Sequence, residues 1–326
     1  MLEIKALREA FEAYRQQHAF TKAPQGLYEP VEYIMSSSGK RLRPVLVLIG
    51  GALFKGDFAY SLPVAMAVEI FHNFSLVHDD IMDAAPLRRG RPAVHTKYGL
   101  NTGILSGDVM LIYAYQFLSK GGKTAREVAA LLNIFNAVAI EVCEGQQFDV
   151  DFESRNDVTI SEYINMIELK TAALIGGSLQ MGGITAGAPP AAQLQLRDFG
   201  RNIGIAFQLQ DDILDTFGDP EKFGKRVGGD ILQNKKTFLI LKALELAEGD
   251  TYKALHDLMT TTPDDEAGKV STVTQILREL SIPAWAEQQK QQYQERAFSA
   301  LGQLDAPQQG KDQLRSLAEQ LLVRES

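Results

Sequence analysis

The sequence predicts a single all-helical domain that spans residues 1–326. Three observations support this fold class. Apolar residues recur at three- and four-residue steps through most of the chain, runs that alternate like a strand are scarce, and no change in composition marks a linker. We therefore expect one helical bundle rather than two domains.

The elements follow from this periodicity. The segment 1–17 is mixed and charged, which is typical of an amphipathic helix. Further helices are predicted at 63–82, 101–118, 125–148, 160–175, 194–217 and 237–246. Pro63 suits the first turn of its helix, where a missing N–H costs nothing. Thr159 and Glu162 have the spacing of a capping box and predict a helix start.

Turn residues separate these helices. Serine, glycine, proline and acidic residues gather at 36–39, 84–92, 120–122, 187–190, 218–220 and 261–266. No segment is low in complexity. The two acidic segments described below resemble each other, but their flanks diverge, so the sequence gives little support for an internal repeat.

Composition excludes several classes of protein. The chain is 45% hydrophobic and 23% charged, as in an ordinary soluble protein, and its net charge of −8 argues against nucleic acid or an anionic membrane as partner. No basic start followed by an apolar segment marks a signal peptide, and the apolar run 44–54 is too short to span a bilayer. The lone Cys143 excludes an internal disulfide and indicates a reducing cytoplasm, and we expect it to fill core space.

An acidic signature occurs twice. Asp79-Asp80-Ile81-Met82-Asp83 and Asp211-Asp212-Ile213-Leu214-Asp215 each follow an apolar stretch. On a helix, positions i and i+4 lie on one face about 5–6 Å apart. The first and last aspartates of each segment should therefore point the same way.

Carboxylates this close repel each other unless a cation lies between them. Mg²⁺ prefers oxygen ligands, and proteins commonly hold it with a few carboxylates together with the phosphates of a substrate. We expect the two segments to face each other across the bundle. The alternative is a pair of solvated acidic helix turns.

One residue pair raises a rival metal site. Glu69 and His72 have the Glu-x-x-His spacing of di-iron helical bundles. Those proteins use the motif twice, and no other histidine in this chain has a glutamate three residues before it. The pair therefore does not predict a di-iron centre.

Basic residues follow both acidic segments closely in the sequence: Arg88, Arg89 and Arg91 after the first, and Lys225 and Lys235 after the second. Other basic residues lie elsewhere in the chain, with Lys40, Arg41 and Arg43 at the start of a predicted helix and Lys170 in mid-chain. Arginine binds phosphate through a fork of two hydrogen bonds, and lysine binds it as a point charge. Carboxylates can bind Mg²⁺ and basic side chains can neutralise phosphate, so their occurrence together indicates a diphosphate leaving group.

These motifs resemble the trans-prenyltransferases, the polyprenyl diphosphate synthases that include farnesyl and geranylgeranyl diphosphate synthases. The resemblance extends over about 39–236 and depends on five motifs in the same order. They are GKRLRP at 39–44, DDIMD with LRRG at 79–90, the pair Lys170-Thr171, FQLQDDILD at 207–215, and GGD with a trailing KKT at 228–237. It implies an all-helical bundle of the isoprenoid synthase type with a central active-site cavity.

The resemblance also implies residue roles. Three Mg²⁺ ions on an allylic diphosphate would be held by Asp79, Asp83, Asp211 and Asp215. Asp80 and Asp212 would assist in the second coordination shell without binding the ions directly. The allylic diphosphate, whether dimethylallyl, geranyl or farnesyl, would be bound by Arg88, Lys170, Lys225 and Lys235. Isopentenyl diphosphate would be bound by Lys40, Arg43, His72 and Arg89. For His72 the alternative is a satisfied core histidine.

Family members ionise the allylic substrate and add isopentenyl diphosphate to the cation. Gln208, the backbone carbonyl near Lys170-Thr171 and an aromatic wall would stabilise that cation. The released diphosphate is the expected proton acceptor, because no side-chain base stands out.

The resemblance implies that another group of residues sets the product length. Phe74, Ser75 and Phe71 precede the first acidic segment on the helix that would wall the hydrocarbon pocket. A bulky residue at Phe74 is typical of short-chain synthases, and the first acidic segment lacks the insertion of bacterial farnesyl diphosphate synthases. We expect geranylgeranyl diphosphate as product, with farnesyl diphosphate as the alternative. Phe71 and Phe74 could instead be plain core residues, with another helix closing the pocket.

Two further alternatives are a class I terpene cyclase and a non-catalytic subunit of a heteromeric prenyltransferase. A cyclase would lack the GKRLRP cluster, and a non-catalytic subunit should have one eroded acidic segment. The resemblance also implies a homodimer.

Overall fold

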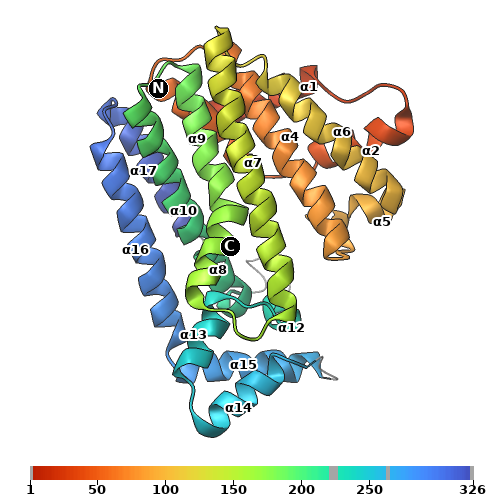
Figure 1. Cartoon of the computed structure of the whole chain (residues 1–326), viewed down its shortest axis with the longest axis vertical. Coiled ribbons are helices and arrows are strands. Elements are labelled where there is room, and N and C mark those ends of the chain that lie inside the picture. Colours follow the sequence, from red (N-terminus) through yellow and green to blue (C-terminus); the bar gives the residue numbers. More distant parts are fainter. Residues whose placement is uncertain (1–2, 220–226, 262–264, 324–326) are drawn as a thin grey trace. The chain divides into compact units, whose positions relative to one another are not determined.

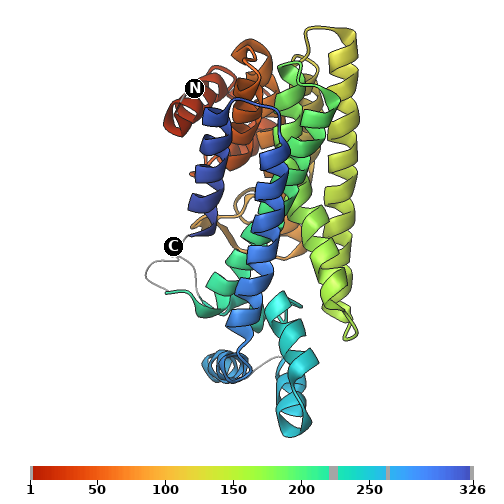
Figure 2. The same cartoon turned by 90° about the vertical axis from the view of Figure 1, so that its left-hand side faces the viewer.

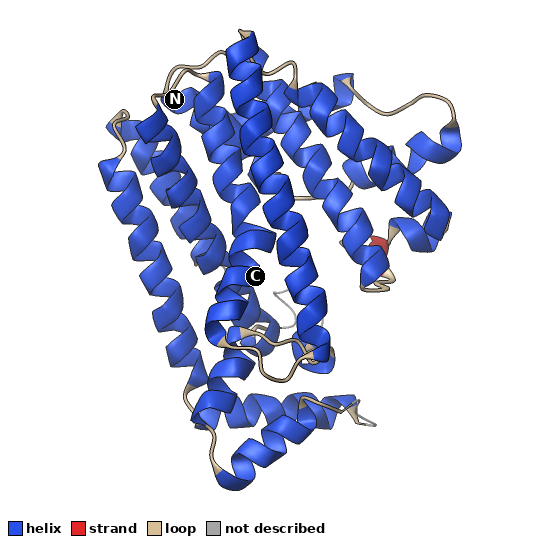
Figure 3. Cartoon of the chain, viewed as in Figure 1, coloured by secondary structure: helices blue, strands red, loops and turns tan. Residues whose placement is uncertain are grey.

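The computed structural model describes residues 3–219, 227–261 and 265–323. Helices dominate it and the strands are minimal, as predicted (Figure 3). The chain forms two compact units, which are described in turn. The first comprises Met1–Ala137, Gly177–Arg197 and Asp305–Gly310, and the second comprises Val138–Gly176, Asp198–Leu304 and Lys311–Ser326.

The elements are named as in Figure 1. In chain order they are α1 (Ile4–Gln17), α2 (Gln25–Met35), α3 (Leu42–Leu53), α4 (Phe58–Met82), β1 (Leu87–Arg88), β2 (Arg91–Pro92), α5 (Val94–Tyr98), α6 (Leu100–Leu118), α7 (Ala125–Ser154), α8 (Ile160–Ile167), the π-helix η1 (Glu168–Ala172), α9 (Ala173–Thr185), α10 (Pro190–Phe217), α12 (Gly229–Leu232), α13 (Phe238–Leu246), α14 (Gly249–Leu258), α15 (Glu266–Glu279), α16 (Ile282–Gln303) and α17 (Gln308–Leu322).

The first unit is built around α4. This helix packs along α6, beside which it lies in Figure 1, and against α3. The buried core of α4 includes Val64, Val68 and Phe71. Such a long buried helix gives the residues at its end a fixed position.

The start of α4 corrects one prediction. Pro63 is not in the first turn, because the helix begins at Phe58. The Asp57 carboxylate caps it by accepting a hydrogen bond from the backbone N of Ala59, at 2.9 Å. Pro63 therefore lies inside the helix and removes one backbone hydrogen bond there. The Pro63 side chain is buried in the core at this position.

The predicted loop at 84–92 contains a short β-hairpin. Leu87 pairs with Pro92 and Arg88 with Arg91 in antiparallel register. Arg89 and Gly90 both have positive φ, at 53° and 74°. Two consecutive residues of positive φ make the tight turn whose twist suits a two-residue hairpin.

The second unit begins with the predicted capping box. The Thr159 side chain accepts from the backbone N of Glu162, and the Glu162 carboxylate accepts from the backbone N of Thr159 at 2.8 Å. The predicted helix 160–175 is interrupted by η1 and then continues through α9. At the other end of this unit α15 packs across α16, and Figure 2 views α15 along its axis while α16 runs lengthwise.

The prediction for Cys143 was wrong. This residue is exposed on α7 rather than buried in the core. Its helix is also the one in the described ranges that is long and apolar enough to cross a membrane, although only 28% of its apolar window is buried. A helix of a soluble protein can meet the same criterion, so the absence of a membrane span stays a prediction.

Candidate active site

The first acidic segment ends α4. Asp79 lies in the last helical turn and Asp83 caps it, with the backbone N of Asp83 donating to the Asp79 carbonyl at 2.9 Å. The side chain of Asp83 is exposed and that of Asp79 is half-buried. Both aspartates are therefore held in place at the end of a long buried helix.

Asp80 points the other way, into the protein. The hairpin residue Arg88 donates from Nε to Asp80 Oδ1 at 2.8 Å and from a terminal nitrogen to Asp79 Oδ2 at 3.3 Å. Burial raises the pKa of Asp80, and the Arg88 guanidinium opposes that rise. Asp80 Oδ2 is also buried without a hydrogen-bond partner among the described residues. The hairpin therefore places Arg88 against the acidic segment.

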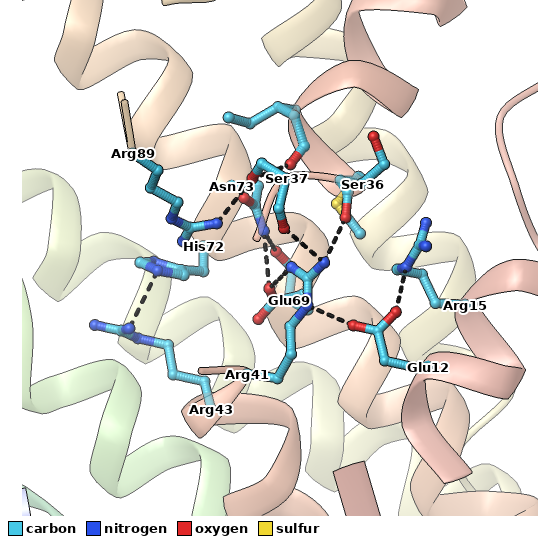
Figure 4. A network of polar contacts seen from close by, with 12 residues as sticks. Glu12, Arg15, Ser36, Ser37, Arg41, Arg43, Glu69, His72, Asn73 and Arg89 are labelled. Carbon is cyan, nitrogen blue, oxygen red and sulfur yellow. Dashed lines mark hydrogen bonds and ion pairs between the residues drawn. The ribbon is translucent and has the colours of Figure 1, made fainter. Parts of the chain in front are cut away.

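A cluster of cations lies elsewhere in the same unit (Figure 4). Arg43 and His72 are 3.1 Å apart between a guanidinium nitrogen and Nε2. Arg89 donates to Ser37 Oγ at 2.9 Å, and its guanidinium lies against Gly39, where a side chain would crowd it. Lys40 is exposed on the same loop. The structure thus brings three of the four residues predicted to bind isopentenyl diphosphate into one network, with Lys40 at its edge.

The electrostatics of this cluster are unusual. Burial lowers the pKa of Arg43 to about 10, and the Arg89 charge acts in the same direction. Burial and the neighbouring arginines hold the pKa of His72 well below its ordinary value. Arg43 Nε is buried without a partner among the described residues. Crowded cations and an unsatisfied buried donor are what an anion-binding site requires.

The contacts of Glu69 argue against a metal role for Glu69 and His72. The Glu69 carboxylate accepts from Arg41 at 2.6 Å and from Asn73 at 3.1 Å, whereas His72 faces Arg43. Among the residues that the structure describes, no three His, Cys, Asp or Glu side chains form a ready-made metal site.

An aromatic cluster surrounds the residues predicted to set product length. Phe71 lies 5.6 Å from Phe74 and 5.2 Å from Phe135 between ring centroids. Phe71 is fully buried and Phe74 is half-buried. The Ser75 hydroxyl donates back to the His72 carbonyl at 2.8 Å. Phe74 is therefore backed by a second aromatic ring.

The second acidic segment lies near the end of α10, in the second unit. Asp211 and Asp215 are half-buried, whereas Asp212 is buried. Tyr163 donates to Asp212 Oδ2, and Gln208 donates to Oδ1 at 3.1 Å. Burial, together with the nearby Asp230, raises the pKa of Asp212 well above its ordinary value.

The end of the segment is fixed by the loop that follows. Asp215 Oδ2 accepts from the backbone N of Asp230 at 2.9 Å, and the Asp215 carbonyl accepts from the backbone N of Gly228 at 2.6 Å. The GGD motif is thus folded back onto α10. Lys225 lies outside the described residues.

A cavity of about 160 Å³ opens in this unit. It gathers the predicted residues Lys170, Thr171, Gln208, Asp212 and Lys235, together with Asp149, Tyr163 and Asp230. Thr171 Oγ1 donates to Gln208 Oε1 at 3.2 Å. The predicted cation-stabilising and phosphate-binding residues of this unit therefore line one pocket.

Lys170 and Thr171 lie in the π-helix η1. Two glycines allow neighbouring helices to approach it closely. A Cβ at Gly145 of α7 would lie 2.3 Å from the backbone N of Lys170, and a Cβ at Gly204 of α10 would lie 2.6 Å from Ala172. Close packing from two sides holds a rare backbone form in place, and such forms are frequent at functional sites.

Asp149 is a site residue that the sequence analysis missed. Its Oδ2 accepts from Lys170 Nζ at 2.6 Å and lies 3.4 Å from Lys235 Nζ. Burial alone would raise the pKa of Asp149, but the two ammonium groups hold it below its ordinary value. Asp149 is one of several acidic residues along α7, so its position in the sequence alone did not distinguish it.

Comparison with known proteins explains why these residues occur together. The family model described as polyprenyl synthetase matches residues 24–277. The chain belongs to the polyprenyl synthetase family. Family membership makes it a prenyltransferase enzyme, and all five motifs lie inside the matched range.

Relatives of this polyprenyl synthetase agree with the assignment. It is 38% identical over 282 residues to geranylgeranyl diphosphate synthase of Sulfolobus acidocaldarius, covering 86% of this chain and 85% of that protein. A crystal structure of geranylgeranyl pyrophosphate synthase matches with a TM-score of 0.94 at 43% identity and covers 100% of both chains. The Corynebacterium glutamicum synthase, complexed with isoprenyl diphosphate and magnesium, matches with a TM-score of 0.87 at 27% identity over 98% of both chains.

Proposed function

We propose that this polyprenyl synthetase condenses isopentenyl diphosphate with allylic diphosphates, head to tail, and releases geranylgeranyl diphosphate. The observation that carries the proposal is the cluster of Arg43, His72 and Arg89, in which the half-buried Arg43 contacts His72 and the exposed Arg89 contacts Ser37. Chain elongation needs a site for a second diphosphate, whereas a terpene cyclase does not. Both acidic segments are complete, which argues against a non-catalytic subunit.

The chemistry of the donor set fits Mg²⁺. Each acidic segment offers carboxylate oxygens from the end of a helix, and Mg²⁺ is commonly held by one or two carboxylates together with substrate phosphates. We propose that Asp79, Asp83, Asp211 and Asp215 hold the ions, three in all. When bound, Mg²⁺ supplies positive charge that stabilises the leaving diphosphate. The magnesium bound to the Corynebacterium glutamicum synthase supports this proposal.

Protein cations complete the neutralisation of the allylic diphosphate. We assign Arg88, Lys170, Lys225 and Lys235 to it. The ammonium groups of Lys170 and Lys235 converge on Asp149, so they are held close together before substrate arrives. Fixed positive charge beside the departing diphosphate lowers the barrier to ionisation.

The allylic cation that ionisation leaves must be stabilised by nearby dipoles and protected from water. Gln208 is held by Thr171 and Asp212, so its amide cannot rotate freely. We assign Gln208, Thr171 and the backbone carbonyls of η1 to stabilisation of the allylic cation. Water must be excluded from the cavity, because it would quench that cation.

Isopentenyl diphosphate occupies the cation cluster in this proposal. Lys40, Arg43 and Arg89 bind its diphosphate, and His72 donates a hydrogen bond. The isopentenyl double bond then attacks the allylic cation, and the released diphosphate accepts the proton.

Phe74 sets the depth of the hydrocarbon pocket in this proposal. Its ring is supported by Phe71 and, behind that, Phe135. A supported aromatic ring limits product length more firmly than a mobile one. The name of the Sulfolobus acidocaldarius relative supports geranylgeranyl diphosphate as product, and farnesyl diphosphate is the second candidate.

Exposed side chains support proposals for the assembly and the compartment. α6 exposes Leu105 and Ile112, and α7 exposes Ile140, each more than half accessible. Exposed apolar side chains on long helices support a homodimer. The free thiol of the exposed Cys143 supports a reducing cytoplasm.

Product analysis tests the function. The protein is incubated with Mg²⁺, labelled isopentenyl diphosphate and dimethylallyl, geranyl or farnesyl diphosphate, and the dephosphorylated products are separated by mass. We expect geranylgeraniol from each primer. Farnesol alone would favour the second candidate, a cyclic hydrocarbon would favour a cyclase, and no product from any primer would contradict the proposal.

A further inference from the structure

Arg41 stands between two residues assigned to isopentenyl diphosphate, yet it has no role of its own so far. Its backbone is left-handed, with φ 50° and ψ 39°, directly before α3. This conformation costs free energy for a residue with a side chain. The surrounding contacts must therefore hold it, and they set the path of the chain between Lys40 and Arg43.

Those contacts use the whole guanidinium (Figure 4). Arg41 Nε donates to Glu12 at 2.7 Å and a terminal nitrogen donates to Glu69 at 2.6 Å. The other terminal nitrogen donates to the carbonyls of Met35 and Ser37, at 2.7 and 3.1 Å. The side chain is only 4% exposed. Arg41 is thus fully engaged by protein groups and does not serve as a phosphate ligand.

One clamping residue comes from outside the range matched by the family model. Glu12 belongs to α1, whereas the match begins at residue 24. Its second oxygen accepts from Arg15 at 2.8 Å, and Arg15 reaches Glu32 of α2 at 3.1 Å. The N-terminal helix is therefore tied by ion pairs to Arg41 and to α2.

The network extends to the cation cluster through Ser37. Its carbonyl accepts from Arg41, and its hydroxyl accepts from Arg89. Movement of Arg41 would thus release the partner of Arg89. It would also change the direction in which the loop presents Lys40 and α3 presents Arg43.

We propose that Arg41, clamped between Glu12 and Glu69, is a positioning residue that holds the isopentenyl diphosphate site in its binding geometry. This inference rests on the proposed function of that site. It assigns α1 a part in substrate binding. Misplacement of binding groups by a fraction of an ångström then appears as weaker binding of one substrate.

Glu12→Gln gives the sharpest test. Glu12 is 30% exposed, so the variant keeps a hydrogen-bond acceptor at a tolerant position while it removes the charge. We expect the KM for isopentenyl diphosphate to rise about tenfold, as for a weakened charge-assisted hydrogen bond. The KM for the allylic diphosphate should stay unchanged.

Two companion variants complete the design. Glu9→Gln is the matched control, because Glu9 lies on the same helix in an exposed pair with Lys5 at 4.0 Å. It should behave as wild type. Arg41→Lys keeps the charge but lacks the planar fork, so it should raise the isopentenyl KM more than Glu12→Gln does.

The outcomes separate the inference from the proposed function. A purely structural role would lower the active fraction and thus kcat, without a selective change in either KM. An unchanged isopentenyl KM in Glu12→Gln and Arg41→Lys, with active wild type, would overturn the inference alone. A wild-type enzyme that fails to elongate any primer would overturn the proposed function itself.

Discussion

The two units hold their cations in different ways. In the first unit, Arg41 is locked by four hydrogen-bond acceptors in a buried network, and Arg43 and Arg89 lie beside it. In the second unit, Lys170 and Lys235 both contact the carboxylate of Asp149. The first arrangement holds a planar guanidinium through several hydrogen bonds, and the second brings two ammonium groups to a shared carboxylate.

This difference matches the demands of the two proposed substrates. Isopentenyl diphosphate keeps its diphosphate through the reaction, so a site of fixed shape suffices. The allylic diphosphate gains negative charge as its carbon–oxygen bond breaks. Lys170 and Lys235, which Asp149 holds close together before the substrate binds, supply fixed positive charge for it.

The largest effect should come from the acidic segments, which we propose as the Mg²⁺ ligands. We expect Asp79→Ala or Asp211→Ala to lower kcat by about three orders of magnitude or more, because each removes a proposed Mg²⁺ ligand. Steady-state turnover and circular dichroism would be measured together. Asp108→Ala, at an exposed aspartate of α6, is the control. Near-normal turnover in both variants with intact folds would remove the metal assignment.

Asp149→Asn addresses the lysine pair directly. Without the carboxylate the two ammonium groups repel each other and lose their common anchor. We expect the KM for the allylic diphosphate to rise by about tenfold to a hundredfold, with the isopentenyl KM unchanged. Asp151→Asn, two residues further on α7 and exposed, is the control. A change in the isopentenyl KM alone would contradict the assignment of Lys170 and Lys235 to the allylic diphosphate.

Phe74→Ala probes the hydrocarbon end of the first unit. Loss of the ring should deepen the pocket and shift the main product to a chain at least one isoprene unit longer, as measured by mass of the dephosphorylated products. The overall rate should fall little, because Phe74 binds neither diphosphate. An unchanged product distribution would mean that another side chain closes the pocket.

The cation cluster should also give a pH signature in stability. Folded His72 stays neutral, because burial and the arginines hold its pKa far below the ordinary value, whereas unfolded His72 binds a proton below about pH 6.5. The unfolded state then binds more protons, so the free energy of unfolding should fall by about 1.4 kcal/mol per pH unit as the pH drops below that point. Urea unfolding from pH 7 to pH 5 measures this slope. His72→Asn should flatten it, and an equal slope in both proteins would contradict the pKa shift.

The sequence predicted the long helices α4, α6, α7 and α10, because their apolar period reflects burial that each segment carries in its own residues. It did not predict α2 or the C-terminal helices α14, α15, α16 and α17. The capping box at Thr159 was predictable for the same reason, since both partners lie within one turn. The hairpin at 87–92 was missed because two-residue strands have no period. The interior position of Pro63 was missed because the cap at Asp57 and the packing of α4 outweighed the usual preference of proline.

The candidate site was predictable where its motifs are local. The acidic segments and the lysine and arginine clusters have informative spacing along the chain. Asp149 and the Glu12 clamp were not predictable, because Asp149 meets Lys170 across 21 residues of sequence and Glu12 meets Arg41 across 29. Cys143 was assigned to the core from residue type alone, and its side of α7 proved to be exposed.

Steady-state kinetics of Glu12→Gln and Asp149→Asn with both substrates, measured side by side, test the central claim that the cluster of Arg43, His72 and Arg89 and the lysine pair Lys170 and Lys235 serve different diphosphates. The account predicts a crossed pattern: Glu12→Gln raises only the isopentenyl KM, and Asp149→Asn raises only the allylic KM. If both variants raise the same KM, or both KM values move together in each variant, the assignment of the cluster and the lysine pair to different diphosphates is contradicted.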